Sequence, residues 1–373
     1  MSRPTADGVR CMLMRGGTSK GLFFLAGDLP AEPADRDALL LAIMGSGHPL
    51  QVDGVGGAHP LASKVAVVSR SEREDADVDY LFLQLGVEQA TITDRQNCGN
   101  ILAGVGPFAV ERGLIDAGSP TTTTRVLMVN SGSVVTAAFA TPGGVPAYAG
   151  GTEIAGVPGS AAPVLLRFAG TAGSATGSLL PTGRVRDVVD GVEVTCVDNG
   201  MPVVVARAGD LGIGGYEAPD ELAADGELTA RVQSLRIAAG KLMGLGDVSG
   251  LSVPKTTLVS SPRDGGTICT RTFIPVRPHT AIGVLGAVSV ATALLLPGGV
   301  GTSVAELAEP AGGGQLVDVE HPTGHLTVEV ELDTSADPPA VLRAGVVRTA
   351  RKLFDGIVFP GPRPATGTTA DCA

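Results

Sequence analysis

The chain has 373 residues, which favours two domains, and its 44% hydrophobic content against 17% charged residues excludes a disordered protein. The net charge is −11 and the basic residues are scattered, so nucleic acid is not an expected partner. The five cysteines are far apart and form no CxxC pair or Cys/His cluster, which argues against a zinc site and against a disulfide scaffold.

Apolar runs separated by turn residues in the first half of the chain predict a mixture of strands and helices. We expect strands at residues 9–14, 64–69 and 80–85, and helices at 28–44 and 101–112. Asp35 is the expected N-cap of the first helix. A glycine-rich turn, Arg15-Gly16-Gly17-Thr18-Ser19-Lys20-Gly21, follows the first strand.

Strands dominate the rest of the chain. They are expected at residues 125–130, 133–139, 163–168, 185–189, 192–197, 203–206, 257–259, 267–274 and 325–332. The dipeptide Asp190-Gly191 predicts a hairpin turn between two of them. One amphipathic helix is expected at 217–244, and residues 360–373 are expected to form a loose tail.

Residues 281–296 form an apolar segment that ends at Pro297-Gly298-Gly299. The segment is shorter than the roughly 18 to 20 residues of a membrane-spanning helix, so we expect a helix buried in a protein core and no membrane partner. Residues 1–10 lack the apolar core of a signal peptide. Together with the cysteine pattern, this predicts a reduced, cytoplasmic protein.

The two halves of the chain show a weak internal repeat. Each has a strand and a tight polar turn, followed later by short polar residues and a glycine-spaced apolar helix. The short polar segments are Asn97-Cys98-Gly99-Asn100 and Pro278-His279-Thr280. Either the halves are related domains whose helix N-termini face a shared cleft, or two glycine-rich helices are alike in composition alone.

Cys98 is the first candidate for chemistry. It lies among small polar residues directly before the apolar run 101–110, which places a thiol at the first turn of a buried helix. The helix dipole and unpaired backbone N–H groups favour a thiolate there and can hold a carboxylate. The alternative is an inert core cysteine, the interpretation that we prefer for Cys11, Cys196 and Cys269.

Lys64 is the second candidate. It lies at the start of an expected strand, in the run Ala62-Ser63-Lys64-Val65-Ala66. A buried lysine has a lowered pKa and can serve as a general base. A strand lysine can equally extend its ammonium group to solvent. The sequence pattern leaves both interpretations open.

Three further segments could bind carboxylates. Thr18 and Ser19 offer hydroxyl donors in a turn that lacks the Gly-Lys-Ser/Thr order of a phosphate loop. Asn199 lies in a tight turn, and His279 precedes the second apolar helix. Each of these residues also has a purely structural interpretation. The hydroxyls of Thr18 and Ser19 can be satisfied within the turn, Asn199 can reflect the backbone preference of Asn in turns, and His279 can cap the helix.

Three motifs in this order resemble the PrpF family. They are Met14-Arg15-Gly16-Gly17-Thr18-Ser19-Lys20-Gly21, Asp53-Gly54-Val55-Gly56-Gly57 leading to Ser63-Lys64-Val65, and Asn97-Cys98-Gly99-Asn100. Asp198-Asn199-Gly200-Met201-Pro202 and residues 282–288 also fit, so the resemblance covers nearly the whole chain. PrpF proteins are cofactor-independent allylic isomerases, and the resemblance therefore implies an enzyme without a cofactor.

The resemblance also implies an α+β fold of the diaminopimelate-epimerase-like type. This fold has two pseudo-symmetric domains, each a mainly antiparallel, β-barrel-like sheet around a central helix. We expect residues 1–186 to form the first domain and residues 187–342 the second. A strand within residues 343–359 is expected to return to the first domain, which would make that domain discontinuous.

The catalytic pair of the family falls on Lys64 and Cys98. Two-thiol racemases of this fold carry a second cysteine at the second helix, where this chain has Pro278-His279-Thr280-Ala281. The resemblance therefore implies an asymmetric lysine–cysteine pair and no metal. The substrate-binding residues that it implies are Gly17, Thr18, Ser19, Asn97, Gly99, Asn100, Asn199, Met201, His279 and Thr280.

The implied reaction is a 1,3-proton shift, keto–enol or allylic, in 4-oxalomesaconate or a close unsaturated tricarboxylate, within the breakdown of gallate- or protocatechuate-type aromatic compounds. We expect Lys64 to remove a proton from an activated CH2 group and Cys98 to return one, with N–H donors stabilising the dienolate. The alternatives are a methylaconitate or methylitaconate isomerase and, from another class, a non-catalytic binding protein that keeps the cleft. A homodimer is left open.

Overall fold

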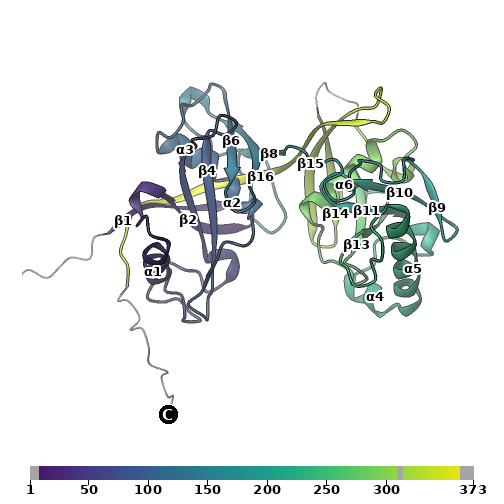
Figure 1. Ribbon diagram of the computed structural model, residues 1–373, viewed down its shortest axis with the longest axis horizontal. Coiled ribbons are helices and arrows are strands. Elements are labelled where there is room, and N and C mark those ends of the chain that lie inside the picture. The colour runs from purple at the N-terminus through teal and green to yellow at the C-terminus, as the bar shows by residue number, and fades with distance from the viewer. Residues whose placement is uncertain (1–7, 309–313, 362–373) are drawn as a thin grey trace, which may run out of the picture. The chain divides into compact units, whose positions relative to one another are not determined.

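The computed structural model describes residues 8–308 and 314–361 (Figure 1). The chain divides into two compact units. Of the described residues, 8–153, 157–166 and 348–361 form the first unit, and 154–156, 167–308 and 314–347 form the second. Cys372 and most of the expected tail lie outside the described residues.

The expected domain boundary between residues 186 and 187 lies inside the second unit. The segment that precedes this boundary is tied to the second unit by Asp198. The Asp198 carboxylate accepts hydrogen bonds from the backbone N–H groups of Ala175 and Thr176 at 2.8 and 2.9 Å. Its carbonyl oxygen accepts from the N–H of Gly173 at 2.7 Å. These are hydrogen bonds between polar groups, and the spacing of hydrophobic residues along the sequence does not predict them.

The first unit is built on a sheet with the strand order β1-β2-β3-β4-β6-β7, and β5 pairs with β4. The pairs β2–β3 and β4–β6 are parallel, whereas β1–β2, β3–β4 and β6–β7 are antiparallel. The bounds are β1 Val9–Gly16, β2 Ser19–Leu25, β3 Lys64–Arg70, β4 Val78–Leu85, β5 Ile92–Thr93, β6 Thr121–Met128 and β7 Ser133–Ala140; β8 (Pro163–Phe168) follows.

The second unit has the strand order β9-β10-β11-β12-β13-β14-β15. The bounds are β9 Asp187–Val189, β10 Val192–Asp198, β11 Pro202–Arg207, β12 Lys255–Ser260, β13 Ile268–Phe273, β14 Gln315–His321 and β15 Gly324–Asp333. The long strand β16 (Ala340–Val358) pairs with β15 through residues 340–346 and with β1 through residues 350–358. The first unit therefore includes a strand from the C-terminal part of the chain.

The two units repeat one topology. The strands β10 to β15 show the same alternation as β1 to β7: the pairs β11–β12 and β13–β14 are parallel, and the pairs between them are antiparallel. Each unit inserts helices between its second and third strands of this series and again between its fourth and fifth. The shared order confirms the expected pseudo-symmetric α+β fold.

Each sheet has a helix on one face and the central helices on the other. In the first unit α1 packs on β2 and β3, while α2 contacts β1 and β2 and α3 contacts β3, β6 and β7. In the second unit α5 packs on one face, and α6 contacts β10, β11, β14 and β15. Figure 1 shows α6 among these strands. The α-helices are α1 Pro33–Met44, α2 Gly99–Leu102, α3 Val105–Glu111, α4 Pro219–Ala224, α5 Gly226–Leu242 and α6 Val284–Leu295, and the 3-10 turns are η1 Ala26–Asp28, η2 Pro60–Ala62, η3 Pro142–Gly144, η4 Ala208–Leu211 and η5 Val300–Val304.

Strand alternation decides which side chains face the central helices. On β3, Val65 and Val67 pack in the cluster around α1. Because successive side chains of a strand point to opposite faces, Lys64 and Ala66 face the central helices instead. This alternation places the candidate lysine on the inner face of its sheet.

The helix expected at residues 101–112 is two short helices, α2 and α3. Pro107 has no N–H group to continue a regular ladder, and the N–H groups of Ala103 and Gly104 bond to carbonyl oxygens three residues back. Gly104 also packs tightly, because a Cβ atom there would lie 2.7 Å from the ring of Phe23. The helix that follows Cys98 is therefore a single turn.

Two other expected helices differ in their bounds. The helix α1 has Glu32 as N-cap with Pro33 at its first position, and Asp35 lies in the first turn. The helix expected at 217–244 is divided by Asp225, whose carboxylate accepts from the N–H of Leu228 and caps α5.

The apolar segment 281–296 is confirmed as a buried helix: α6 is buried along nearly its whole length. It begins at Val284 because the N–H of Ala281 bonds to Nδ1 of His279 in a turn. Over the described ranges, we find no helix that combines the length and the apolar character needed to cross a bilayer.

Candidate active site

Lys64 lies at the first position of β3, between Gly21 on β2 and Gln84 on β4. The residue is 7% exposed. Its Nζ donates a hydrogen bond to Oε1 of Gln84 at 2.5 Å and lies 5.1 Å from the ring centroid of Phe82. Burial lowers the pKa of Lys64, and the negative charge of a Cys98 thiolate opposes that shift. The side chain does not extend to solvent, which decides between the two interpretations of its sequence.

No carboxylate among residues 8–308 and 314–361 forms an ion pair with Lys64; its amine donates to the amide oxygen of Gln84, and the charge of a Cys98 thiolate reaches it. A lysine beside a carboxylate would stay charged at neutral pH. Lys64 can instead lose its proton more readily than an exposed lysine, which is the requirement for a base.

Cys98 is the N-cap of α2 and is half-buried, with an extended backbone at φ −130° and ψ 96°. Its carbonyl oxygen accepts hydrogen bonds from the hydroxyl of Tyr80 at 3.3 Å and from the N–H of Leu102 at 3.0 Å. The space beside Gly99 is open, since a Cβ atom there would meet no atom within 4 Å. Two hydrogen bonds thus fix the backbone of Cys98 while the adjoining residue leaves room for a small molecule.

The glycine-rich turn packs directly on the start of α2. A Cβ atom on Gly17 would lie 2.2 Å from Oδ1 of Asn100, and the positive φ of Gly17, 51°, also favours glycine. Nδ2 of Asn100 donates to the Thr18 hydroxyl at 2.9 Å. The Arg15 guanidinium holds the other side of the turn by donating to the carbonyl oxygens of Gly17 and Thr349. The glycine-rich turn is therefore fixed against the start of α2, next to Cys98.

Ser19 lies on the same face of β2 as Gly21, because one residue, Lys20, separates them along the strand. The residue is 1% exposed, and its hydroxyl has no hydrogen-bond partner among the residues that the structure describes. Asn97, by contrast, is exposed. The first unit thus brings together Lys64, Cys98, Thr18 and Asn100, with Ser19 buried in the adjoining strand.

Gln84 and Tyr80 contact the two candidate catalytic residues but belong to none of the sequence motifs. The only available signal is weak: both are polar residues within the apolar strand expected at 80–85. Their spacing of four residues along β4 places them on one face, the face of Lys64.

Asn199 and Met201 belong to a buried network of the second unit. Asn199 is fully buried; its Oδ1 accepts from the Thr171 hydroxyl at 2.5 Å and its Nδ2 donates to the Thr292 hydroxyl at 2.8 Å. The Ser289 hydroxyl accepts from the N–H of Asn199 and donates to the carbonyl oxygen of Met201. These bonds attach the turn between β10 and β11 to α6 and occupy the polar atoms of Asn199.

His279 and Thr280 also belong to the second unit, in the loop before α6. Nδ1 of His279 accepts from the N–H of Ala281 at 2.8 Å, and the carbonyl oxygen of Thr280 accepts from the Thr323 hydroxyl at 2.9 Å. The N-cap of α6 is Gly283, so neither residue lies within the first helical turn. The imidazole and the Thr280 carbonyl are used to hold this loop.

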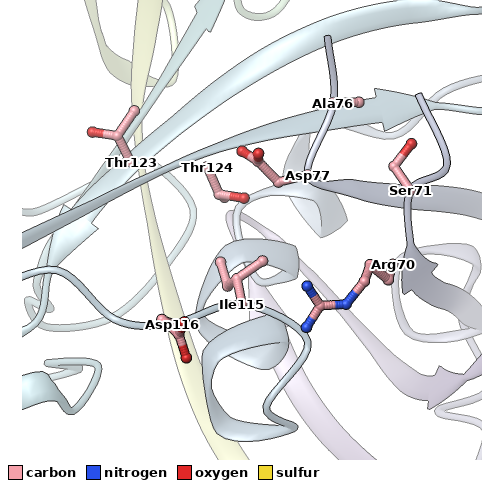
Figure 2. Close-up of a pocket in the computed structure, with 8 residues that line it drawn as sticks. All are labelled: Arg70, Ser71, Ala76, Asp77, Ile115, Asp116, Thr123 and Thr124. Atoms are coloured by element: carbon pink, nitrogen blue, oxygen red, sulfur yellow. The ribbon is translucent and has the colours of Figure 1, made fainter. Parts of the chain in front are cut away.

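A separate polar pocket of about 390 Å³ lies at the far end of β3 from Lys64. Arg70 ends β3, so about 20 Å of strand separates it from Lys64. Figure 2 shows Arg70 extending its guanidinium into this pocket, with Asp77 and Asp116 also lining it. Carboxylates repel an anionic substrate, and no expected site residue lies here.

Comparison with known proteins identifies the family. The profile described as PrpF protein matches residues 7–360. The chain belongs to the PrpF family. It is 56% identical over 353 residues to a (4E)-oxalomesaconate Delta-isomerase of Novosphingobium sp., covering 95% of this chain and 98% of that one. It is 53% identical over 353 residues to a 4-oxalomesaconate tautomerase of Pseudomonas putida, covering 95% and 96%.

A solved structure supports the same assignment. The crystal structure of a methylitaconate-delta-isomerase matches with a TM-score of 0.82 and 32% identity, covering 95% of this chain and 96% of that chain. This match confirms the expected epimerase-like fold. The relatives are isomerases and a tautomerase, which confirms the expected enzyme class: the chain is an isomerase of the PrpF family.

Thiol labelling will distinguish Cys98 from the other described cysteines. Burial raises the pKa of Cys11 to about 11 and that of Cys196 to about 12, so these thiols are both covered and protonated. We expect iodoacetamide at pH 8 to alkylate Cys98 at least tenfold faster than Cys11 or Cys196 in the folded protein, measured by peptide mass mapping.

The same measurement in urea supplies the control, because all thiols should then react at similar rates. Peptide mapping also keeps the Cys372 peptide separate. Equal protection of Cys98 and Cys196 in the folded protein would contradict the open position of Cys98.

Proposed function

We propose that the chain catalyses a 1,3-proton shift in 4-oxalomesaconate, with Lys64 as general base and Cys98 as general acid. One observation carries the proposal: a buried lysine, without a carboxylate partner among the described residues, lies within electrostatic range of a free and half-buried cysteine. Two proton-handling groups of different chemistry suit a reaction that removes a proton from one atom and adds a proton to another.

The base step begins at the CH2 group between the 2-oxo group and the C=C bond, which both neighbours acidify. Lys64 must be neutral to accept this proton. Burial among apolar groups lowers its pKa and so raises the neutral fraction at neutral pH. The electron pair of the broken C–H bond then spreads over a dienolate.

The acid step returns a proton at the far carbon of the former C=C bond. The Cys98 thiol donates it, the new C=C bond lies next to the 2-oxo group, and the net result is migration of the double bond. This leaves an ammonium ion on Lys64 and a thiolate on Cys98, whose opposite charges attract. Proton transfer from ammonium to thiolate through water restores both groups.

The residues that we propose to bind the substrate carboxylates come from the sequence motifs. We propose that Gly17, Thr18 and Ser19 contribute donors from the turn, and that Asn97, Gly99 and Asn100 contribute them from the start of α2. Two observations support this part of the proposal: the Ser19 hydroxyl has no partner in the described part of the chain, and the space beside Gly99 is open. In the second unit we propose Met201, His279 and Thr280 as substrate-binding residues, and Asn199 as the residue that holds the turn before Met201.

Sequence identity guides the choice of substrate. The relatives named for 4-oxalomesaconate are 56% and 53% identical to this chain, whereas the methylitaconate-delta-isomerase of known structure is 32% identical. A methylaconitate or methylitaconate isomerase is therefore the second candidate, supported by that structural match.

The test is turnover of 4-oxalomesaconate in D2O, followed by NMR of both acids. We expect deuterium at the CH2 carbon of recovered substrate and at the far allylic carbon of the product, above the rate without enzyme. Deuterium at the CH2 carbon alone, with only the enol formed, would assign the keto–enol form of the shift. Methylitaconate and methylaconitate serve as competing substrates.

A binding protein without activity gives a different result. If 4-oxalomesaconate bound but exchanged no C–H proton above the uncatalysed rate, the enzymatic proposal would be wrong. If methylitaconate were turned over with a higher kcat/KM than 4-oxalomesaconate, the substrate would be wrong and the proton shift would stand.

We also propose a reducing, cytoplasmic location. Cys11, Cys98, Cys196 and Cys269 are all free thiols in the structure, which supports this location. A role in the breakdown of aromatic compounds stays a prediction from the resemblance.

A further inference from the structure

Gln84 lies directly opposite Lys64 in the β3–β4 register. Directly paired residues of antiparallel strands project from the same face, with Cβ atoms about 5 Å apart. Their side chains meet: Oε1 of Gln84 accepts the hydrogen bond of Lys64 Nζ at 2.5 Å. Gln84 is therefore the nearest polar group to the proposed base.

The amide of Gln84 is held in one orientation. Its Nε2 lies 3.1 Å from the carbonyl oxygen of Pro60, 3.0 Å from that of Ser63 and 3.2 Å from that of Leu85. A flipped amide would set Oε1 against three carbonyl oxygens and Nε2 against the Lys64 donor. The hydrogen-bond network therefore requires the oxygen to face Lys64.

A neutral acceptor suits both charge states of a base. A neutral amine has two N–H donors and one lone pair, so an N–H directed at Gln84 limits where the lone pair points. After the amine accepts a proton, the ammonium ion keeps the same bond. The contact with the Phe82 ring restricts the Lys64 stem further. Lys64 can thus gain and lose a proton without moving.

The charge at position 84 matters because few titratable groups face Lys64. Cys98 and Tyr80 lie on its side of the sheet. Lys20 on β2 and Asp79 on β4 occupy the alternate positions and point to the opposite face. Because no carboxylate of the described residues pairs with Lys64, a carboxylate at position 84 would bring an anion into direct contact with the ammonium ion and would hold its proton.

We propose that Gln84 is a positioning residue for Lys64: its amide, fixed by three backbone carbonyls, aims the amine and supplies an acceptor without charge. The inference rests on the proposed function of Lys64 as base. It assigns Gln84 no contact with the substrate and no proton transfer of its own.

The experiment compares Gln84→Glu and Gln84→Met with wild type. The first variant keeps an oxygen acceptor and adds charge, and the second removes the acceptor at similar length. Gln89→Glu is the matched control, because Gln89 is exposed in the loop after β4. The pKa of Lys64 is read without substrate by NMR of 13Cε-labelled lysine, and kcat/KM is measured from pH 6 to 10.

We expect Gln84→Glu to raise the Lys64 pKa by about one unit or more, since an opposite charge in contact favours the ammonium form. Activity needs neutral Lys64, so kcat/KM rises with pH through this pKa. The rise should therefore move to higher pH, with the plateau within about fivefold of wild type. Gln84→Met should lower the plateau at least tenfold at every pH, mainly through kcat.

An unchanged Lys64 pKa in Gln84→Glu, or a full plateau in Gln84→Met, would overturn the inference. The control Gln89→Glu should match wild type in both readouts. A purely structural role of Gln84 would lower the melting temperature without moving the Lys64 pKa. Because the NMR titration needs no substrate, absence of turnover in wild type would sink the proposed function while leaving the Gln84–Lys64 coupling testable.

Discussion

Replacement of Lys64 by methionine will lower kcat/KM for 4-oxalomesaconate by about 100- to 10,000-fold, the usual contribution of one general acid–base group. Methionine keeps the length and the packing of the stem against Phe82, but has no lone pair on nitrogen to accept the CH2 proton. The loss should be in kcat, with KM changed by less than about tenfold. Steady-state kinetics and a thermal melt of each variant measure this.

The stability of Lys64→Met should stay close to that of wild type, because the variant removes a buried amine that costs desolvation as well as its hydrogen bond to Gln84. Lys241→Met is the matched control, since Lys241 is exposed on the last turn of α5 in the second unit. Wild-type activity in Lys64→Met would remove the base from the proposal. Equal losses in Lys241→Met would show a general effect of the substitution.

The hydrophobic period identified most strands from sequence, because half-buried strands alternate and short apolar runs end at turns. Each strand that we expected overlaps a strand of the structure. The pattern did not predict β14, and Glu320 explains why: this strand carries a buried carboxylate that accepts hydrogen bonds from the N–H groups of Arg263, Asp264 and Gly266. From the sequence alone, a buried glutamate whose carboxylate is bound by backbone N–H groups cannot be distinguished from an exposed glutamate.

The nature of Lys64 could not be decided from the sequence, because the deciding contacts come from β4. Gln84 and Phe82 lie about twenty residues away along the chain, and their register with β3 sets both contacts. The local pattern of hydrophobic residues predicts a strand, but it does not predict which strand pairs with it. The same limit applies to the segment before residue 187, which the Asp198 carboxylate attaches to the second unit.

Cys98 lies before a shorter helix than its sequence predicts. The sequence suggested a long helix whose dipole would favour a thiolate, but α2 has only four residues. A helix of one turn has a small macrodipole, so its field contributes little. Lys64 lies close enough for a Cys98 thiolate to oppose the lowering of the Lys64 pKa. Proximity to a helix in the sequence therefore does not by itself account for the chemistry proposed for Cys98.

Replacement of Cys98 by serine separates the two proton transfers. A serine hydroxyl is a far weaker acid than a thiol, so the return of a proton at the far carbon should slow by about 100- to 10,000-fold. Lys64 is intact in this variant and should still remove the CH2 proton. We therefore expect product formation to fall while deuterium from solvent continues to enter the CH2 carbon of the substrate, as measured by NMR in D2O.

The pair of variants decides which residue begins the reaction. If Lys64 is the base, exchange at the CH2 carbon persists in Cys98→Ser and is lost in Lys64→Met, after subtraction of the uncatalysed rate. The reverse pattern would make Cys98 the base and Lys64 the acid, with the same pair of residues and the opposite order. Cys196→Ala controls for loss of a thiol, because Cys196 is buried in the second unit and its pKa is raised by burial. Loss of exchange in both variants would mean that neither residue removes the proton without the other. The two proton transfers would then depend on both residues at once and would not be separate steps.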